Sequence, residues 1–431
     1  MAKFVYGVLF VIGSAVLPLF AHSYGPPPAV TAGPGDNQKA CTQCHAGTLN
    51  SGTGGVKIST LSGPVYVPGV RQRIFVTVSD PNQQRWGFEL TARLDSDPSN
   101  SSAGDLIPVD NFTQVICADA GAKPCSGPSF IEHTSVGTRN GTKNGATFQF
   151  DWNPPATDVG TVTFYVAGNA ANGNSASTGD FIYTSSLQMS PLKPVAPVVP
   201  ASNIVSSATS APGTVGAFSW VTAYGTNLSA TTRGWDASDF VNGAMPTSLD
   251  GVSVVLTYFG APRLATIGYV SPTQVNFLLP SDTSATTVQV QVRNPAGITP
   301  QAPITVATAA PQFLTAADGK HVFGTHADGT SLTQSPAAKG ETVTLYATGC
   351  GPTSPALIPG IVPSQAAALG TLPQITVGGA AATVSGANVF PGTGGVYQVS
   401  VQVPASAASG DLPLLIQTGT FVSAQALLPV K

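Results

Sequence analysis

Charged side chains are scarce in this chain of 431 residues, and their scarcity excludes several classes of function. Lys and Arg number 17 and Asp and Glu number 20, so the formal net charge is -3. A chain without a basic patch cannot neutralise many phosphates, so nucleic acid is not an expected partner. Beyond Phe20, no stretch reaches the ~20 consecutive apolar residues that a membrane-spanning helix needs.

Familiar catalytic motifs are also missing from the sequence. There is no G-x-S-x-G nucleophile elbow, no H-E-x-x-H helix and no Gly-rich phosphate loop followed by Lys. His321 and His326 stand five residues apart, a spacing that suits chelation on neither a strand nor a helix. Nucleophilic hydrolysis therefore has no support, and we expect an electron carrier or surface protein instead of an enzyme.

Glycine and proline are abundant, with 47 and 37 residues, and the apolar share is 42%. Val, Thr and Ser dominate the rest, which is typical of short β-strands joined by tight turns. An apolar share this high excludes a disordered chain. The composition predicts an all-β protein of two to four domains.

The first 23 residues have the pattern of a secretory signal peptide. Lys3 supplies the positive start, residues 4–20 are apolar, and Ala21-His22-Ser23 is a small-x-small cleavage site before Tyr24. The alternative is an uncleaved membrane anchor. The pattern predicts an extracytoplasmic protein: secreted, at the cell surface or in the periplasm.

Cys41-Thr42-Gln43-Cys44-His45 is the motif that carries chemistry. C-x-x-C-H is the attachment signature of c-type haem, in which both thiols bind the porphyrin covalently. The adjacent imidazole then serves as proximal iron ligand. Two alternatives stay open: a Cys41–Cys44 disulfide with His45 incidental, and a zinc site, although the sequence has no second Cys/His pair at metal spacing.

Other residues are candidates for completing such a site. We expect His133 to be the sixth iron ligand, with Met189 as the alternative and a five-coordinate iron as a third arrangement. Trp86 is expected to wall the porphyrin, although an aromatic residue on a strand also suits a sandwich core. Asp180 suits either a calcium site or a simple Asx-turn.

Three further cysteines follow in the chain. Cys117 and Cys125 flank a short loop and are natural partners for a disulfide in an oxidising compartment. Cys350 is left over, so it is either a buried small hydrophobe or an intermolecular partner.

Turn signals and apolar patterns divide the mature chain. Strands are expected at 73–78, 88–94, 147–152 and 161–167, all in a first domain at 24–192. A Pro-rich segment at 193–203 is expected to act as a semi-rigid spacer.

An internal repeat organises the remainder. Tyr224 and Gln274 in the first copy correspond to Tyr346 and Gln398 in the second, at nearly equal separation. Each copy has short alternating strands, which predicts two tandem immunoglobulin-like sandwiches at 204–308 and 309–431.

Several separated motifs give the chain a family resemblance. They are Gly25-Pro26-Pro27-Pro28, the Cys41–His45 motif, residues 85–90, residues 131–134, Phe150-Asp151-Trp152 with Pro155, and Gly179-Asp180. With these, residues 25–189 resemble the choice-of-anchor V domain, a relative of the Reeler domain. Residues from about 200 onward resemble an uncharacterised Solibacter-type C-terminal domain. The resemblance implies a Reeler-like β-sandwich in the first domain.

Three functional hypotheses follow. The first is an exported monohaem c-type protein in electron transfer or redox sensing, working with an extracytoplasmic redox partner or cell-surface component. The second is a structural or adhesive surface protein with a C-x-x-C disulfide and no haem. The third is a haem enzyme, which would need polar groups at an open distal site.

Overall fold

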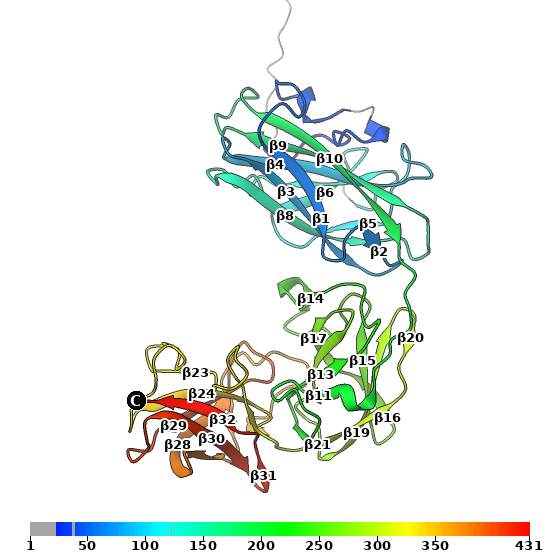
Figure 1. The fold of residues 1–431 in the computed structure, drawn as a ribbon. Coiled ribbons are helices and arrows are strands. Elements are labelled where there is room, and N and C mark those ends of the chain that lie inside the picture. The colour runs from blue at the N-terminus through cyan, green and yellow to red at the C-terminus, as the bar shows by residue number, and fades with distance from the viewer. Residues whose placement is uncertain (1–22, 37–38, 122) are drawn as a thin grey trace, which may run out of the picture. The chain divides into compact units, whose positions relative to one another are not determined.

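The computed structural model describes residues 23–36, 39–121 and 123–431; the predicted signal peptide therefore lies almost entirely outside the described residues. The described chain consists of β-strands and four short 3-10 turns, with no α-helix in these ranges (Figure 1). The all-β prediction is thus confirmed. The chain divides into two compact units, residues 1–191 and 192–431.

The first unit is a sandwich of two sheets, antiparallel except for one short pair of strands, which is parallel. The four-stranded sheet has the order β1 (Gly55–Thr60), β3 (Gln72–Asp80), β8 (Asn144–Asn153) and β5 (Asp105–Pro108). The six-stranded sheet has the order β2 (Val65–Tyr66), β10 (Phe181–Pro191), β9 (Val162–Ala171), β4 (Arg85–Leu94), β7 (Ser129–His133) and β6 (Thr113–Cys117). The parallel pair is β2–β10. Alternate side chains of both sheets meet in one core, because successive residues of a strand point to opposite faces.

The strands predicted in this unit occur in the structure, and each runs longer than its apolar pattern. β3 continues to Asp80, and β4 begins at Arg85 instead of residue 88. Their polar ends pair with neighbouring strands through the backbone, which apolar periodicity does not report.

The residues before β1 lie on the outer face of the six-stranded sheet. Val30 donates its backbone N–H to the Glu89 carboxylate at 2.7 Å, and Cys41 packs against Ala167 and Ile182. Glu89 is opposite Ala167 in the β4–β9 register, so these side chains share the face turned away from the sandwich core. We call residues 23–36 and 39–46 the N-terminal segment; it covers part of this face.

The second unit begins with a two-sheet sandwich. One sheet has the order β11 (Ile204–Ser206), β13 (Trp220–Tyr224), β18 (Gln274–Leu278), β17 (Thr266–Val270) and β14 (Arg233–Gly234). The other has the order β12 (Val215–Gly216), β21 (Ala302–Ala307), β19 (Thr286–Asn294), β15 (Ser253–Tyr258) and β16 (Ala261–Leu264), with β20 (Gly297–Ile298) beside β19.

The remaining strands form a second sandwich whose sheets share one long strand. The order is β22 (Gln312–Phe313), β24 (Thr342–Thr348), β29 (Tyr397–Gln402), β28 (Ala380–Val389), β27 (Gln374–Val377), β30 (Gly410–Thr418) and β31 (Phe421–Val422). Flanking strands are β23 (Gly324–Thr325), β25 (Thr353–Ser354), β26 (Ala368–Leu369) and β32 (Ala426–Val430). β28 pairs with β27 through its first residues and with β29 through its last, and a register shift follows Val384. Such a bulge lets one strand turn from sheet to sheet.

The internal repeat corresponds to equivalent strand pairs. Tyr224 is directly opposite Gln274 in β13–β18, and Tyr346 is directly opposite Gln398 in β24–β29. The sequence similarity therefore reflects the same cross-strand pairing in the two sandwiches.

The two sandwiches of the second unit share apolar contacts. Phe218, Met245 and Leu278 of the first belong to the core cluster of the second. The indole N–H of Trp220 also donates to the carbonyl of Gly394 at 2.8 Å. Burial of these side chains favours one compact unit.

The segment at 193–203 differs from the predicted spacer. Val198 and Thr226 exchange two backbone hydrogen bonds, and Asn294 donates its side-chain amide to the carbonyl of Val195. These bonds satisfy backbone groups that a free polyproline segment would leave to water. The segment is therefore part of the second unit.

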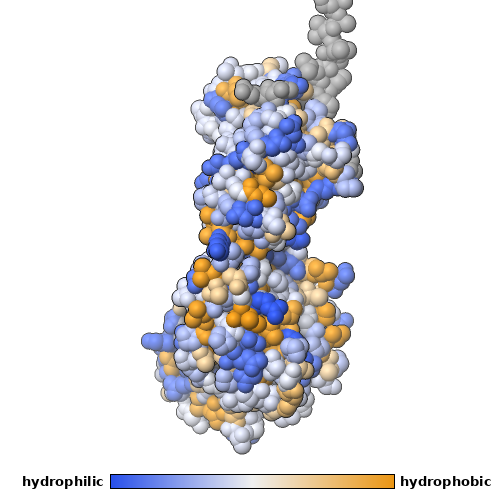
Figure 2. Space-filling model, turned by 90° about the vertical axis from the view of Figure 1, so that its right-hand side faces the viewer, coloured by the Kyte–Doolittle hydropathy of each residue, from blue (hydrophilic) through white to orange (hydrophobic). Residues whose placement is uncertain are grey.

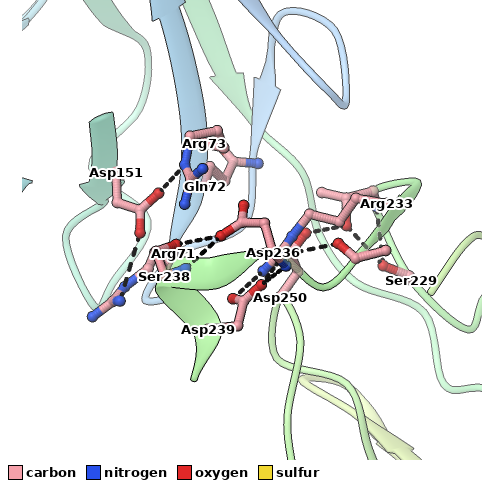
Figure 3. Close-up of polar contacts among 12 residues, drawn as sticks. Arg71, Gln72, Arg73, Asp151, Ser229, Arg233, Asp236, Ser238, Asp239 and Asp250 are labelled. Carbon is pink, nitrogen blue, oxygen red and sulfur yellow. Dashed lines mark hydrogen bonds and ion pairs between the residues drawn. The ribbon is translucent and has the colours of Figure 1, made fainter. Parts of the chain in front are cut away.

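Ion pairs are few and are partly buried within each unit. In the first unit Arg73 pairs with Asp151 at 2.5 Å, and in the second Arg233 pairs with Asp239 at 2.7 Å and Asp250 at 2.9 Å (Figure 3). On the face drawn in Figure 2, apolar residues form separate patches among polar ones. This agrees with a surface whose polarity comes mostly from uncharged side chains.

Equivalent hairpins of the two sandwiches lead to a stability prediction. The β15–β16 turn places Phe259 and Gly260 at φ +47° and +84°, whereas the β27–β28 turn places Gly378 and Gly379 at +58° and +83°. Positive φ at both central residues defines a turn that favours Asn-Gly or Gly-Gly. Phe259 is 83% exposed and gains little packing there.

We expect Phe259→Asn to stabilise the second unit by about 1 kcal/mol, because asparagine tolerates the left-handed conformation better than phenylalanine does. Calorimetry of the full chain measures this as a higher melting temperature. The reciprocal control, Gly378→Ala, should lower it. An unchanged or lower melting temperature for Phe259→Asn would show that the turn carries no strain.

Candidate functional site

A pocket of about 200 Å³ lies in the first unit between the N-terminal segment and the outer face of the six-stranded sheet. Its lining brings together residues that are far apart in the sequence. Its lining includes Cys41, Cys44, His45, Arg85, Trp86, His133, Asn169 and Asp180. The C-x-x-C-H motif and the predicted sixth ligand thus line the same pocket.

The motif itself forms a tight turn. Cys41–Gln43 is a 3-10 turn, and the carbonyl of Cys41 accepts the backbone N–H groups of Cys44 at 3.2 Å and His45 at 3.0 Å. Cys41 is buried, Cys44 is partly exposed, and both thiols are free. Burial raises the pKa of the Cys41 thiol to about 12, so this thiol stays protonated at neutral pH.

His45 is held by two polar side chains of the sheet. Its Nδ1 lies 2.6 Å from Oδ2 of Asp180, and its Nε2 lies 3.1 Å from Nδ2 of Asn169. A carboxylate can only accept, so Nδ1 carries the proton, and the lone pair of Nε2 accepts the amide N–H of Asn169. This is the tautomer that a metal-binding imidazole requires.

Asp180 is the functional residue whose role the sequence did not reveal. Its carboxylate is 1% exposed, and Oδ1 also accepts the backbone N–H of Asn172 at 3.1 Å. The structure therefore gives Asp180 two contacts that only the folded sheet creates, to Asn172 and to His45, and neither is the local bond to the backbone two residues on that defines an Asx-turn.

His133 reaches the pocket from the end of β7. The ring is buried, and Nδ1 lies 3.1 Å from the backbone nitrogen of Phe88. A Cβ atom at Gly87 would lie 2.8 Å from the ring atom Cε1 of His133, too close for any other residue at that position. Gly87 thus provides the space that the imidazole occupies.

Met189 and Trp86, the other residues predicted to contact the haem, lie in different environments. Met189 is fully buried in the sandwich core opposite Val162 and does not line the pocket. Trp86 lines the pocket, but its ring is 1% exposed and its indole N–H donates to the carbonyl of Thr142. It serves mainly as core and forms only the floor of the site.

Asn169 has an unusual environment. Its Oδ1 is buried and has no hydrogen-bond partner among the described residues, while Nδ2 contacts His45. A buried polar atom without a partner costs free energy, of the order of 1–3 kcal/mol. Asn169 is therefore a point at which a bound group would find an acceptor.

Two glutamates lie under the start of the N-terminal segment. Glu89 and Glu132 are directly opposite each other in β4 and β7, and both are buried. Gln114 donates to Oε1 of Glu132 at 2.7 Å. Burial raises the pKa of Glu132 to about 7 and that of Glu89 well above its ordinary range.

These groups give the first unit a defined pH dependence. Glu132 binds its proton more tightly folded than unfolded, so its contribution to stability is complete below about pH 4.5 and is lost as the pH rises to about 7. The slope is at most ~1.4 kcal/mol per pH unit. We expect Glu132→Gln, an analogue of the protonated form, to flatten the pH dependence of the melting temperature over this window. Parallel curves for wild type and variant would contradict the assignment.

The remaining cysteines occupy structural positions. Cys117 and Cys125 form a disulfide, the pair that the sequence singled out. Cys350 is free and buried in the core of the second unit, where burial raises its pKa. Its position agrees with a small hydrophobe and gives a partner chain no access to the thiol.

The described residues contain neither a cluster of metal ligands nor a membrane-spanning helix. Within residues 23–36, 39–121 and 123–431, no group of three or more His, Cys, Asp or Glu side chains is arranged to hold a metal ion. The same part of the chain contains no helix long and apolar enough to cross a membrane.

Comparison with known proteins finds low structural similarity to several solved structures. No family model and no curated protein matches the sequence. Among solved structures, the reeler domain of human F-spondin matches 33% of this chain and 94% of its own length, at 20% identity and a TM-score of 0.22. A three-immunoglobulin-domain fragment of titin matches 88% of this chain and 99% of its own length, at 9% identity and a TM-score of 0.17. The BSP domain of a biofilm associated protein matches 90% of this chain and 68% of its own length, at 9% identity and a TM-score of 0.19.

Proposed function

We propose that this chain is a modular extracytoplasmic surface protein whose first sandwich carries one haem c on Cys41, Cys44 and His45. One observation carries the proposal: the C-x-x-C-H motif and His133, which are remote in sequence, line the same pocket. We also propose that residues 25–189 belong to the choice-of-anchor V family. The C-terminal part would then belong to the Solibacter-type family that it resembles.

The residues of the pocket fit the group. Two thiols and an imidazole are the donor set that covalent haem attachment needs. Nδ1 of His45 is bonded to Asp180, so Nε2 is the ligand atom, and the group would replace its contact with the amide of Asn169. His133 lies against a glycine that leaves room for its ring. The unpartnered Oδ1 of Asn169 marks a polar atom that nothing in the described chain satisfies.

Each residue then has a defined task. Cys41 and Cys44 would hold the group, His45 would bind the metal through Nε2, and His133 is the candidate for a second metal ligand. The N-terminal segment and the apolar floor at Trp86 keep water from the buried side of the pocket. When bound, haem c supplies one-electron chemistry. The chain's role would be electron transfer or redox sensing with an extracytoplasmic partner.

A structural role without haem is the second candidate. The all-β architecture, the Cys117–Cys125 disulfide and the low charge support a structural or adhesive surface protein directly. In that case Cys41 and Cys44 would form a disulfide, and His45 and Asp180 would only fasten the N-terminal segment to the sheet. The architecture favours this role, and the pocket favours haem.

A reduced pyridine haemochrome spectrum separates the two candidates. The full chain is produced in a host that matures c-type cytochromes and is then purified. The proposal predicts haem c bands at one haem per chain. Their absence, together with a Cys41–Cys44 disulfide in peptide mapping, would support the structural role.

A further inference from the structure

The bond between Asp180 and His45 has a consequence for the redox properties of the pocket. Asp180 immediately precedes β10, and His45 ends the C-x-x-C-H motif, so their contact joins the motif to the sheet. The distance of 2.6 Å between Oδ2 and Nδ1 is short, and the carboxylate is 1% exposed. In such a dry environment a charged hydrogen bond is strong.

The surroundings fix the position of Asp180. Its second oxygen accepts the backbone N–H of Asn172, and the adjacent carbonyl of Gly179 accepts from Gln83. The backbone N–H of Ala46 donates to the carbonyl of Ser177 at 2.8 Å, which ties the end of the motif to the same loop. Asp180 therefore meets His45 in a geometry that is held from both sides.

A carboxylate on Nδ1 changes the imidazole as a ligand. It draws the Nδ1 proton toward itself, so electron density at Nε2 rises and His45 becomes a stronger donor. A stronger, more anionic donor stabilises the higher oxidation state of a metal at Nε2. Hydrogen bonding to an axial ligand is one of the levers by which a protein sets a haem potential.

We infer that Asp180 is the positioning residue that holds His45 as its Nδ1–H tautomer and lowers the reduction potential of the site. This inference rests on the proposed haem attachment. It assigns a direction to this contact: the carboxylate favours the oxidised state relative to the same site without it. Asn169, the other polar contact of His45, is uncharged and has no comparable effect.

The test is a potentiometric titration of haem-loaded wild type and Asp180→Asn. Asparagine can still accept the Nδ1 proton through its carbonyl oxygen but lacks the charge. The expected result is equal haem content with an upward shift of the midpoint potential. The matched control is Asp80→Asn, a fully buried carboxylate of the same unit outside the pocket, which should leave the potential unchanged.

The outcomes separate this inference from the proposed function. If the wild-type chain binds no haem, both the proposed haem attachment and the proposed role of Asp180 are wrong. Equal haem content with an unchanged potential in Asp180→Asn overturns the role of Asp180 and leaves haem attachment intact. If Asp180→Asn loads no haem, Asp180→Glu decides: recovery of haem shows that the charge holds His45, and failure to recover overturns the inference.

Discussion

The double variant Cys41→Ser/Cys44→Ser is expected to lose all covalently bound haem, whereas the wild-type chain retains one haem through denaturation. Each thiol contributes one bond to the porphyrin, and a serine hydroxyl does not replace it. Haem staining of a denaturing gel measures the difference directly, because only a covalently held group migrates with the polypeptide. The expected effect is complete loss of the stained band.

A matched control uses another cysteine of the same chain. Cys350 is also a free, buried thiol but belongs to the second unit, so Cys350→Ala should leave the stained band unchanged. A band of full intensity in the double variant would contradict attachment through Cys41 and Cys44. Each single variant should retain one thioether and a weaker band.

The second large effect concerns the core that supports the pocket. We expect Trp152→Ala to destabilise the first unit by about 3–5 kcal/mol, the range for removing a large buried aromatic side chain. Trp152 is fully buried, its ring contacts Tyr66 and Phe164 edge to face, and its indole N–H donates to the carbonyl of Ala103 at 2.6 Å. The variant loses both the ring and the hydrogen bond.

Calorimetry of the full chain measures this loss with an internal reference. The transition of residues 1–191 should shift to lower temperature, while the transition of residues 192–431 should stay in place. Trp152→Phe, which keeps an aromatic ring but loses the N–H, should produce a smaller shift. Equal shifts for the two variants would show that the hydrogen bond, and not the ring, carries the stability.

Much of the fold could be predicted from local patterns. The period-2 apolar residues of β3, β4, β8 and β9 are carried by the sequence itself, and so is the repeat that pairs Tyr224 with Gln274. The disulfide partners Cys117 and Cys125 are also close in sequence. Patterns between residues that are close in sequence can be recognised without knowledge of the three-dimensional structure.

The site depended on contacts that no local pattern contains. His45 and Asp180 meet only because β10 returns beside β9 and the N-terminal segment crosses that face. The space for the His133 ring comes from Gly87 on a neighbouring strand, and its role cannot be read from a lone glycine. Met189 was a reasonable ligand by residue type, but strand pairing places it in the core.

The Pro-rich segment illustrates a different limit. Its composition predicts an extended conformation but not what lies beside it. Thr226 and Asn294 supply the hydrogen bonds that join the segment to the second unit, and both are remote from it in sequence. Conformational preference and tertiary pairing are thus separate pieces of information.

The intact mass of the full chain, purified under denaturing conditions from a host that matures c-type cytochromes, tests the central claim most directly. The account predicts the mass of the polypeptide plus one haem, because thioethers at Cys41 and Cys44 survive denaturation. A mass equal to the polypeptide alone, lower by two hydrogens for each disulfide, would contradict the haem. It would leave a structural surface protein whose N-terminal segment is fastened at Cys41–Cys44.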